Sequence, residues 1–234
     1  MDITELSRVL GQYGLICRGG FHPDPSDGLP ETTQTVLLIG NAGSAMWGRF
    51  AADVPEHTRR EARHPLDDWT RRTLTAIAER FGARPLFPFE GPPYWPFQTW
   101  AARAEPVFPS PLKMLIHPVF GLWHAYRGAL IFPERLELLE RANALNPCLA
   151  CTSQPCLTAC PVDAFSDQGY DVAACQGFLR SKSGRDCMNH GCAARRACPV
   201  GRSYRYQPAH AQFHMRAFIT AGLSATISAN GHHQ

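Results

Sequence analysis

Hydrophobic and polar positions along the first 132 residues predict a mixture of strands and helices. The apolar run at 36–39, which ends at Gly40, is typical of a buried strand. Residues 67–81 are predicted to form a helix, because acidic residues occupy the first turn and apolar residues recur on one face. Gly82 is expected to end this helix. A further strand is expected at residues 125–132.

The pattern changes between residues 85 and 118. This stretch contains nine prolines, with Tyr94, Trp95, Phe97 and Trp100 among them. Proline donates no hydrogen bond to a β-ladder, so regular sheet throughout the stretch is excluded. Disordered linkers are poor in aromatic residues, and we therefore predict an ordered loop or lid. Further along the chain, residues 133–145 and 208–221 are predicted to be helices.

Composition places the 234-residue chain among compact globular proteins, since 44% of its residues are hydrophobic. No apolar run approaches the roughly 20 residues that a membrane helix needs, and the start MDITELSRVL has no signal-peptide pattern. We therefore expect a cytoplasmic protein without a membrane partner. The net charge of +3 is too small to indicate binding of nucleic acid over the whole surface.

Cysteines are the strongest chemical signal, because eight of the nine fall between residues 148 and 198. Residues 148–161 have the spacing C-x2-C-x4-C-x3-C-P, and Cys175 is followed by Cys187-x4-Cys192-x5-Cys198-Pro. A bacterial ferredoxin run is C-x2-C-x2-C-x3-C-P, and its fourth cysteine binds the other cluster of a pair. Eight cysteines make two sets of four, so we predict two 4Fe–4S clusters. Zinc, the alternative for four-cysteine sites, does not account for the Cys-Pro endings.

The exchange of the fourth cysteine between clusters gives the expected ligands. One cluster is predicted to bind Cys148, Cys151, Cys156 and Cys198, and the other Cys160, Cys175, Cys187 and Cys192. The remaining cysteine, Cys17, is predicted to lie in a buried strand and to bind no metal.

Basic residues gather between positions 180 and 205, where Asp186 is the single acidic residue. Three interpretations stay open: a docking site for an external electron donor such as ferredoxin or flavodoxin, a contact with RNA phosphates, or a solvated face. His210 and His214 lack the intervening Glu of a zinc-protease motif and are predicted to be surface residues.

The cysteine region resembles the ferredoxin-like module of epoxyqueuosine reductase, which also places a lone cysteine between two cysteine groups. Reductive dehalogenases carry a related module with two clusters. In both families the clusters deliver electrons to cobalamin, so the resemblance implies the same acceptor here.

Three segments before the cysteines resemble the cobalamin-processing CblC (MMACHC) family. They are Ala45-Met46, residues 64–67 (HPLD) and residues 116–128 (IHPVFGLWHAYRG). The last is the most specific, because the family pattern there is close to I-H-P-x-F-G-G-W-F-A-I-R-G. The resemblance covers residues 40–133 and implies a nitroreductase-like α+β fold, cobalamin bound with its lower base displaced, and reductive removal of the upper ligand.

The same resemblance implies a cobalamin site whose residues are His117, Phe120, Gly121, Trp123, Tyr126, Arg127 and Gly128. Glycines let backbone approach a flat macrocycle, aromatic rings offer apolar surface, and the family links the arginine to glutathione use. Alternatively, the aromatic residues pack in a core and His117 caps a turn. Leu122 replaces a family glycine and would reshape the pocket, for which FMN is a less favoured occupant.

Together these observations predict an α+β protein with a CblC-like domain (1–140), a ferredoxin-like domain with two 4Fe–4S clusters (141–204) and a C-terminal helix and tail (205–234). The expected function is an oxidoreductase that passes electrons through the clusters to base-off cobalamin and removes its upper ligand, for example cyanide. Two alternatives stay open. One is an epoxyqueuosine-reductase-like or dehalogenase-like enzyme, for which Glu105, Tyr94 and Tyr126 are the candidate proton donors, and the other is a plain electron carrier.

Overall fold

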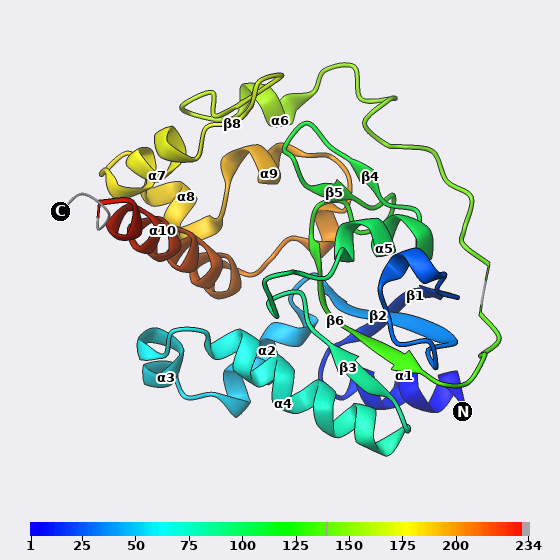
Figure 1. Ribbon diagram of the computed structural model, residues 1–234. Coiled ribbons are helices and arrows are strands. Elements are labelled where there is room, and N and C mark those ends of the chain that lie inside the picture. The colour runs from blue at the N-terminus through cyan, green and yellow to red at the C-terminus, as the bar shows by residue number, and fades with distance from the viewer. Residues whose placement is uncertain (139, 231–234) are drawn as a thin grey trace. The chain divides into compact units, whose positions relative to one another are not determined.

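The computed structural model describes residues 1–138 and 140–230, and the chain divides into two compact units (Figure 1). Unit 1 consists of Met1–Phe108 and His124–Leu145, and unit 2 consists of Pro109–Trp123 and the chain from Asn146 onward. The compact units therefore differ from the predicted division at residues 140 and 204. Residues 109–123, expected in the N-terminal domain, belong to the unit that carries the clustered cysteines.

Unit 1 is built on a four-stranded antiparallel sheet with the strand order β1-β2-β6-β3. Its strands are β1 (Ile16–Phe21), β2 (Thr35–Ala42), β3 (Arg84–Leu86) and β6 (His124–Phe132). The two predicted strands are confirmed as the central pair, in a register from Thr35 opposite Phe132 to Ala42 opposite His124. Side chains of β2 are buried almost throughout, as expected of a strand that is covered on both faces.

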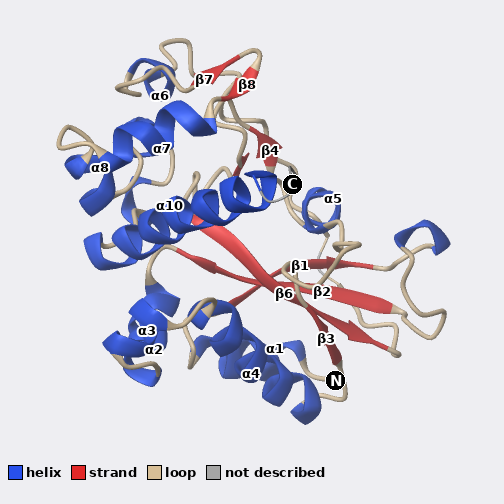
Figure 2. Ribbon diagram, turned by 60° about the vertical axis from the view of Figure 1, so that its left-hand side comes forward, coloured by secondary structure: helices blue, strands red, loops and turns tan. Residues whose placement is uncertain are grey.

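Helices cover both faces of this sheet, with α1, α2 and α4 on one face and α5 on the other (Figure 2). The helices of unit 1 are α1 (Ile3–Gly11), η1 (Pro25–Asp27), α2 (Ala45–Asp53), α3 (Glu56–Glu61), α4 (Pro65–Arg80) and α5 (Phe97–Ala104). α4 confirms the helix predicted at 67–81, and Gly82 follows it in a left-handed conformation.

Two local predictions need correction. The proline-rich stretch contains the regular helix α5, whose buried Trp100 donates a hydrogen bond to Asp27. No helix forms in the described part of 133–145 (133–138 and 140–145). There the backbone is held by β2, because Leu136 N–H donates to the Thr35 hydroxyl, which itself donates to the Glu134 carbonyl. These tertiary hydrogen bonds override the local helical pattern.

Unit 2 is made of short helices and two small β-hairpins around the cysteines. Its elements are β4 (Phe108–Pro109) paired with β5 (Leu115–Ile116), α6 (Pro155–Thr158), β7 (Phe165–Ser166) paired with β8 (Gly169–Tyr170), α7 (Val172–Arg180), α8 (Arg185–His190), α9 (Ala193–Ala197), η2 (Arg202–Tyr204) and α10 (Pro208–Asn230). α10 packs on α7 and α8 and contains the helix predicted at 208–221. The two units together confirm the α+β class.

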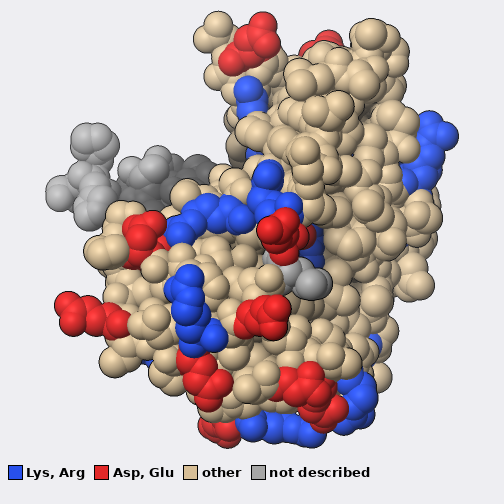
Figure 3. Space-filling model, turned by 90° about the vertical axis from the view of Figure 1, so that its right-hand side faces the viewer, with Lys and Arg blue, Asp and Glu red and all other residues tan. Residues whose placement is uncertain are grey.

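Acidic and basic side chains are interspersed on the face of the molecule shown in Figure 3. This mixture agrees with the small net charge of +3. A search of the described residues for a helix long and apolar enough to cross a membrane finds none.

Candidate metal centres

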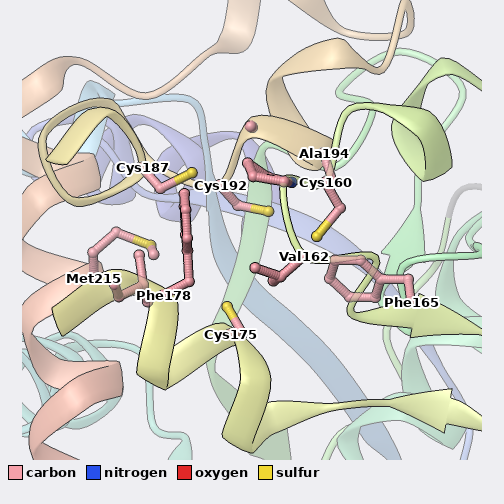
Figure 4. A pocket seen from close by; sticks show the side chains of 12 residues that line it. Cys160, Val162, Phe165, Cys175, Phe178, Cys187, Cys192, Ala194 and Met215 are labelled. Carbon is pink, nitrogen blue, oxygen red and sulfur yellow. The ribbon is translucent and has the colours of Figure 1, made fainter. Parts of the chain in front are cut away.

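Four cysteines line one pocket in unit 2. Cys160 follows α6, Cys175 lies on α7, Cys187 lies on α8 and Cys192 caps the N-terminus of α9. Figure 4 shows that the four sulfur atoms point into the same space. The rest of the wall is apolar and includes Val162, Phe165, Phe178, Leu179 and Met215. Side chains from four separate elements therefore surround one hollow.

The other four cysteines of the array line a second pocket in the same unit. Cys148, Cys151 and Cys156 come from the first cysteine group, and Cys198 comes from the second. Prolines and aliphatic residues complete this wall: Pro111, Ile116, Pro147, Pro155, Pro199 and Val200. The cysteines of the first pocket thus lie up to 32 residues apart in the chain, and those of the second up to 50.

Burial and mutual repulsion act on the thiols of each pocket. Burial raises the pKa of Cys148 and of Cys156, and the neighbouring Cys198 raises both further. Burial likewise raises the pKa of Cys192, although the nearby backbone N–H groups of Arg195 and Ala194 oppose the rise. Such thiols must lose protons before they bind a metal.

The donor set of each pocket consists of four cysteines, with no His, Asp or Glu among the described residues that line it. Among the described residues, no three His, Cys, Asp or Glu side chains are close enough together to hold a metal ion. Four ligands of one zinc would have to converge within about 2.3 Å of a single point. The two sets surround hollows that are partly open to solvent. By its chemistry, each set of four cysteines suits a 4Fe–4S cluster as well as a zinc ion.

Hydrogen-bond donors also approach the sulfur atoms of the first pocket. The backbone N–H of Ala164 donates to Cys160 Sγ over 3.3 Å. The Tyr170 hydroxyl lies beside Cys175, where it lowers the pKa of a thiol that burial otherwise raises. The Tyr170 ring is held by stacking on Phe165, with 4.6 Å between the ring centroids. Donors of this kind stabilise a thiolate and tune the potential of a bound cluster.

The seven residues implied by the CblC resemblance are divided between the units, and none of them lines either cysteine pocket. His117 Nδ1 accepts hydrogen bonds from the N–H groups of Val119 and Phe120, at 3.0 and 3.2 Å. It therefore caps its own turn, as the structural alternative predicted. Its ring also stacks on Phe120, with 4.4 Å between centroids.

Gly121 and Trp123 pack against other parts of unit 2. Gly121 has a φ of +59°, and a Cβ atom at this position would lie 2.2 Å from the Val200 carbonyl oxygen. Trp123 is 1% exposed and packs edge-on against Tyr206, while its Nε1 makes no hydrogen bond. The close backbone approach expected toward a macrocycle is, at Gly121, an approach to the protein's own chain.

Tyr126, Arg127 and Gly128 lie on β6 in unit 1. The Tyr126 hydroxyl donates to the Glu105 carboxylate, and Arg127 Nε donates to Asn41 Oδ1 over 3.2 Å. The space beside Gly128 is filled by packed side chains and backbone. Tyr126 and Arg127 are half-buried, so part of each stays accessible. Their contact with cobalamin stays a prediction.

Arg127 also lies close to Asp67, at the end of the second CblC-like segment. Burial raises the pKa of Asp67, and the Arg127 guanidinium opposes this rise. The structure thus brings together two segments of the resemblance that are 60 residues apart in the sequence.

A buried ion pair near this site escaped sequence analysis. Arg18 binds Glu105 through two nitrogen–oxygen contacts of 2.6 and 3.1 Å, and the two side chains are 1% and 9% exposed. Burial raises the pKa of Glu105, while Arg18 and the Tyr126 hydroxyl oppose the rise. Arg18 lies on β1 and Glu105 ends α5, and no spacing in the sequence indicates their pairing.

Two other expectations concern residues outside the cysteine pockets. Cys17 lies in β1 of unit 1, half-buried, and burial raises its pKa. The prediction of surface histidines is wrong for His210, which is completely buried. Its ring stacks on Tyr206, and its Nε2 lies 3.1 Å from that of His214. The Tyr206 ring shields His210 from solvent, and the helical pattern of the sequence does not indicate this contact.

Fold and sites define an α+β protein with an antiparallel sheet unit and a cysteine-rich unit. No protein-family model matches the chain, and no curated protein is similar to it. Solved structures with a similar fold include the B12-trafficking protein CblC of C. elegans, a human MMACHC homologue, with a TM-score of 0.54 and 15% identity. That match covers 92% of this chain and 95% of the other.

Epoxyqueuosine reductases are also similar in structure. A selenomethionine-labelled example has a TM-score of 0.50 and 17% identity, covering 90% of this chain and 70% of the other. The Streptococcus thermophilus enzyme has a TM-score of 0.50 and 15% identity, covering 88% and 68%. At these identities the likeness concerns the fold, which this chain shares with both groups of proteins.

Proposed function

We propose that this protein is an iron–sulfur oxidoreductase that passes electrons through two 4Fe–4S clusters to cobalamin. The observation that carries the proposal is the grouping of eight cysteines around two pockets, four to each. The grouping agrees with the exchange of cysteines between the two halves of a ferredoxin run. Cobalamin as the acceptor is supported by the likeness to a B12-trafficking fold over nearly the whole chain.

The chain's own residues supply binding and insulation. Cys148, Cys151, Cys156 and Cys198 would hold one cluster, and Cys160, Cys175, Cys187 and Cys192 the other. When bound, such clusters supply one-electron transfer at potentials set by charge, hydrogen bonds and solvent exposure. Apolar side chains line both hollows, which are partly open to solvent, and the N–H of Ala164 offsets negative charge at Cys160.

In unit 1, the half-buried Tyr126 and Arg127 are the residues we assign to contact with cobalamin. Arg127 offers a guanidinium, which suits the carboxamide oxygens at the rim of the macrocycle. The cofactor would bind with its lower base displaced and would lose its upper ligand on reduction, as in decyanation. FMN is a less favoured occupant. An external ferredoxin or flavodoxin would supply the electrons.

The epoxyqueuosine-reductase-like alternative is favoured by the structural neighbours of that class. It requires a proton donor for an external substrate. Glu105 is hydrogen-bonded inside the protein to Arg18 and Tyr126, whereas Tyr94 is 63% exposed. Substrate-dependent turnover would support this alternative. Clusters without any cobalamin binding would support a plain electron carrier.

Single cysteine replacements test the cluster assignment, with Cys17 as the matched control. After anaerobic reconstitution, Cys156→Ala and Cys187→Ala should each retain iron and sulfide for one cluster, while Cys17→Ala retains both. The visible absorption of 4Fe–4S clusters should fall in the same proportion. Zinc in the purified protein, or a full iron content in both pocket variants, would overturn the assignment.

Cobalamin binding is tested by anaerobic absorbance titration with cyanocobalamin, before and after addition of dithionite. We expect a base-off spectrum, followed by conversion to cob(II)alamin faster than in free solution. Arg127→Leu should weaken binding, whereas the exposed Arg84→Leu on β3 should not. An unshifted corrin spectrum in a protein with intact clusters would contradict the cobalamin part of the proposal.

A further inference from the structure

The helix α9 joins the two cysteine pockets directly. This five-residue helix has Cys192 as its N-cap and Cys198 as its C-cap. Cys192 lines the first pocket and Cys198 lines the second. Any tilt or shift of α9 would therefore move a sulfur ligand of both pockets at once.

We propose that Arg195, in the middle of α9, is a positioning residue that fixes the two cluster pockets relative to each other. The inference rests on the proposed function, because it concerns the same two clusters. Arg195 contacts neither pocket through its side chain in the structure, and its effect would be exerted through the helix that carries it.

The Arg195 guanidinium is clamped by three groups. It lies over the rings of Trp123 and Tyr206, at 4.3 and 4.5 Å from their centroids. Its Nε and Nη2 both donate to the carbonyl oxygen of Leu122, over 3.1 and 2.5 Å. Both rings are more than nine-tenths buried. Two cation–π contacts combined with two directed hydrogen bonds restrict the guanidinium far more than a surface ion pair would.

The partners of Arg195 are themselves fixed to the chain that follows α9. A Cβ atom on Gly121 would lie 2.2 Å from the Val200 carbonyl oxygen, and one on Gly201 would lie 2.3 Å from the Phe120 carbonyl oxygen. The turn that contains Phe120 and Gly121 therefore packs backbone to backbone against Val200 and Gly201. The segment from α9 to Gly201 is held on one side by Arg195 and on the other by this contact.

The neighbouring Arg196 provides a matched control on the same helix. It carries the same charge, but its side chain is 30% exposed and pairs with Asp186. Its Nε donates to the Gly191 carbonyl over 3.2 Å, so it contacts the chain before α9 and not the turn at 117–123. Replacing it removes an equal charge without releasing the clamp.

The magnetic interaction between two reduced clusters reports their separation and orientation, and it requires no substrate. We would reduce the reconstituted protein fully and record EPR spectra of wild type, Arg195→Leu, Arg195→Lys and Arg196→Leu. Arg195→Leu is expected to alter this interaction in the spectrum. Arg196→Leu should match wild type.

Arg195→Lys separates position from charge, because lysine keeps the charge but not the planar fork. It should show an altered interaction with both clusters present. If Arg195→Leu loses a cluster, the magnetic interaction is measured in Arg195→Lys instead. A wild-type interaction spectrum in an Arg195 variant with two intact clusters would overturn the inference. Absence of clusters from the wild-type protein would instead overturn the proposed function.

Discussion

Replacement of Gly121 with alanine tests whether the turn at 117–123 supports the cysteine pocket that contains Cys198. Gly121 has a φ of +59°, and the new Cβ would lie 2.2 Å from the Val200 carbonyl oxygen and 2.7 Å from its carbonyl carbon. Real Cβ atoms do not approach such atoms within 3.0 Å. Both neighbours are backbone, so the chain beside Cys198 must move.

Two costs add at Gly121. A left-handed conformation costs a residue with a side chain about 1–2 kcal/mol. Forcing extra atoms into a packed site costs about 1–3 kcal/mol more. The sum is about 2–5 kcal/mol, and each kcal/mol corresponds to roughly 4–8 °C in the melting temperature of a small unit. Gly82 has a φ of +65° with nothing within 4 Å of its Cβ position, so Gly82→Ala incurs only the first cost.

Thermal unfolding and iron analysis together form the assay. The visible absorption of the proposed clusters would report on unit 2, and far-ultraviolet circular dichroism reports on the whole chain. Gly121→Ala should melt earlier than Gly82→Ala and should lose iron from one pocket, because displacement of Val200 moves Cys198. A Gly121→Ala protein with full iron content and no greater loss of stability than Gly82→Ala would refute the packing argument.

Three further predictions follow from other contacts. Tyr170→Phe removes the hydroxyl beside Cys175 and should shift the one-electron equilibrium of that cluster about tenfold toward the oxidised form, or ~59 mV, with the other cluster unchanged in an EPR-monitored redox titration. Glu105→Gln leaves the buried Arg18 without its carboxylate and should cost about 3–5 kcal/mol in urea unfolding, against under ~0.5 kcal/mol for Glu56→Gln in the exposed pair with Arg60. Removal of the proposed clusters should speed amide hydrogen exchange in α7 and α8. It should leave β2 and β6 protected, because the sheet has its own buried core. An equal loss of protection in β2 would contradict the independence of the two units.

Local sequence patterns were sufficient to predict those elements whose burial follows from their own sequence. The apolar run at 36–39 predicts a buried strand, and β2 is buried because helices cover both faces of the sheet. The helix α5 was not predicted, because prolines flank it in the sequence. Pro96 at its N-terminus is nevertheless compatible with a helix start. The segment 133–145 has helical periodicity, but hydrogen bonds to Thr35 compete with that helix. Such long-range competition leaves no local signal.

Predictions about the sites depend on the same distinction. Cysteine spacing predicts two sets of four, and the structure places each set around its own pocket, while the nature of the bound metal stays a proposal. A cysteine that lies among three other cysteines has few roles other than metal binding or disulfide formation. An aromatic residue has many, and Trp123 is surrounded by Arg195 and Tyr206. Sequence alone does not specify which of its possible neighbours a ring contacts.

The CblC-like segment 116–128 therefore combines two kinds of residue. His117, Gly121 and Trp123 are occupied by contacts within unit 2, and their packing supports the chain that carries Cys198. Tyr126 and Arg127 follow on β6 without an intervening linker and stay half-buried. Loss of cobalamin binding in a Trp123→Ala variant would not identify a contact, because the same change removes the stacking partner of Arg195. Arg127 is the more informative position, because its replacement leaves this packing in unit 2 intact and changes contacts within unit 1, among them the hydrogen bond to Asn41.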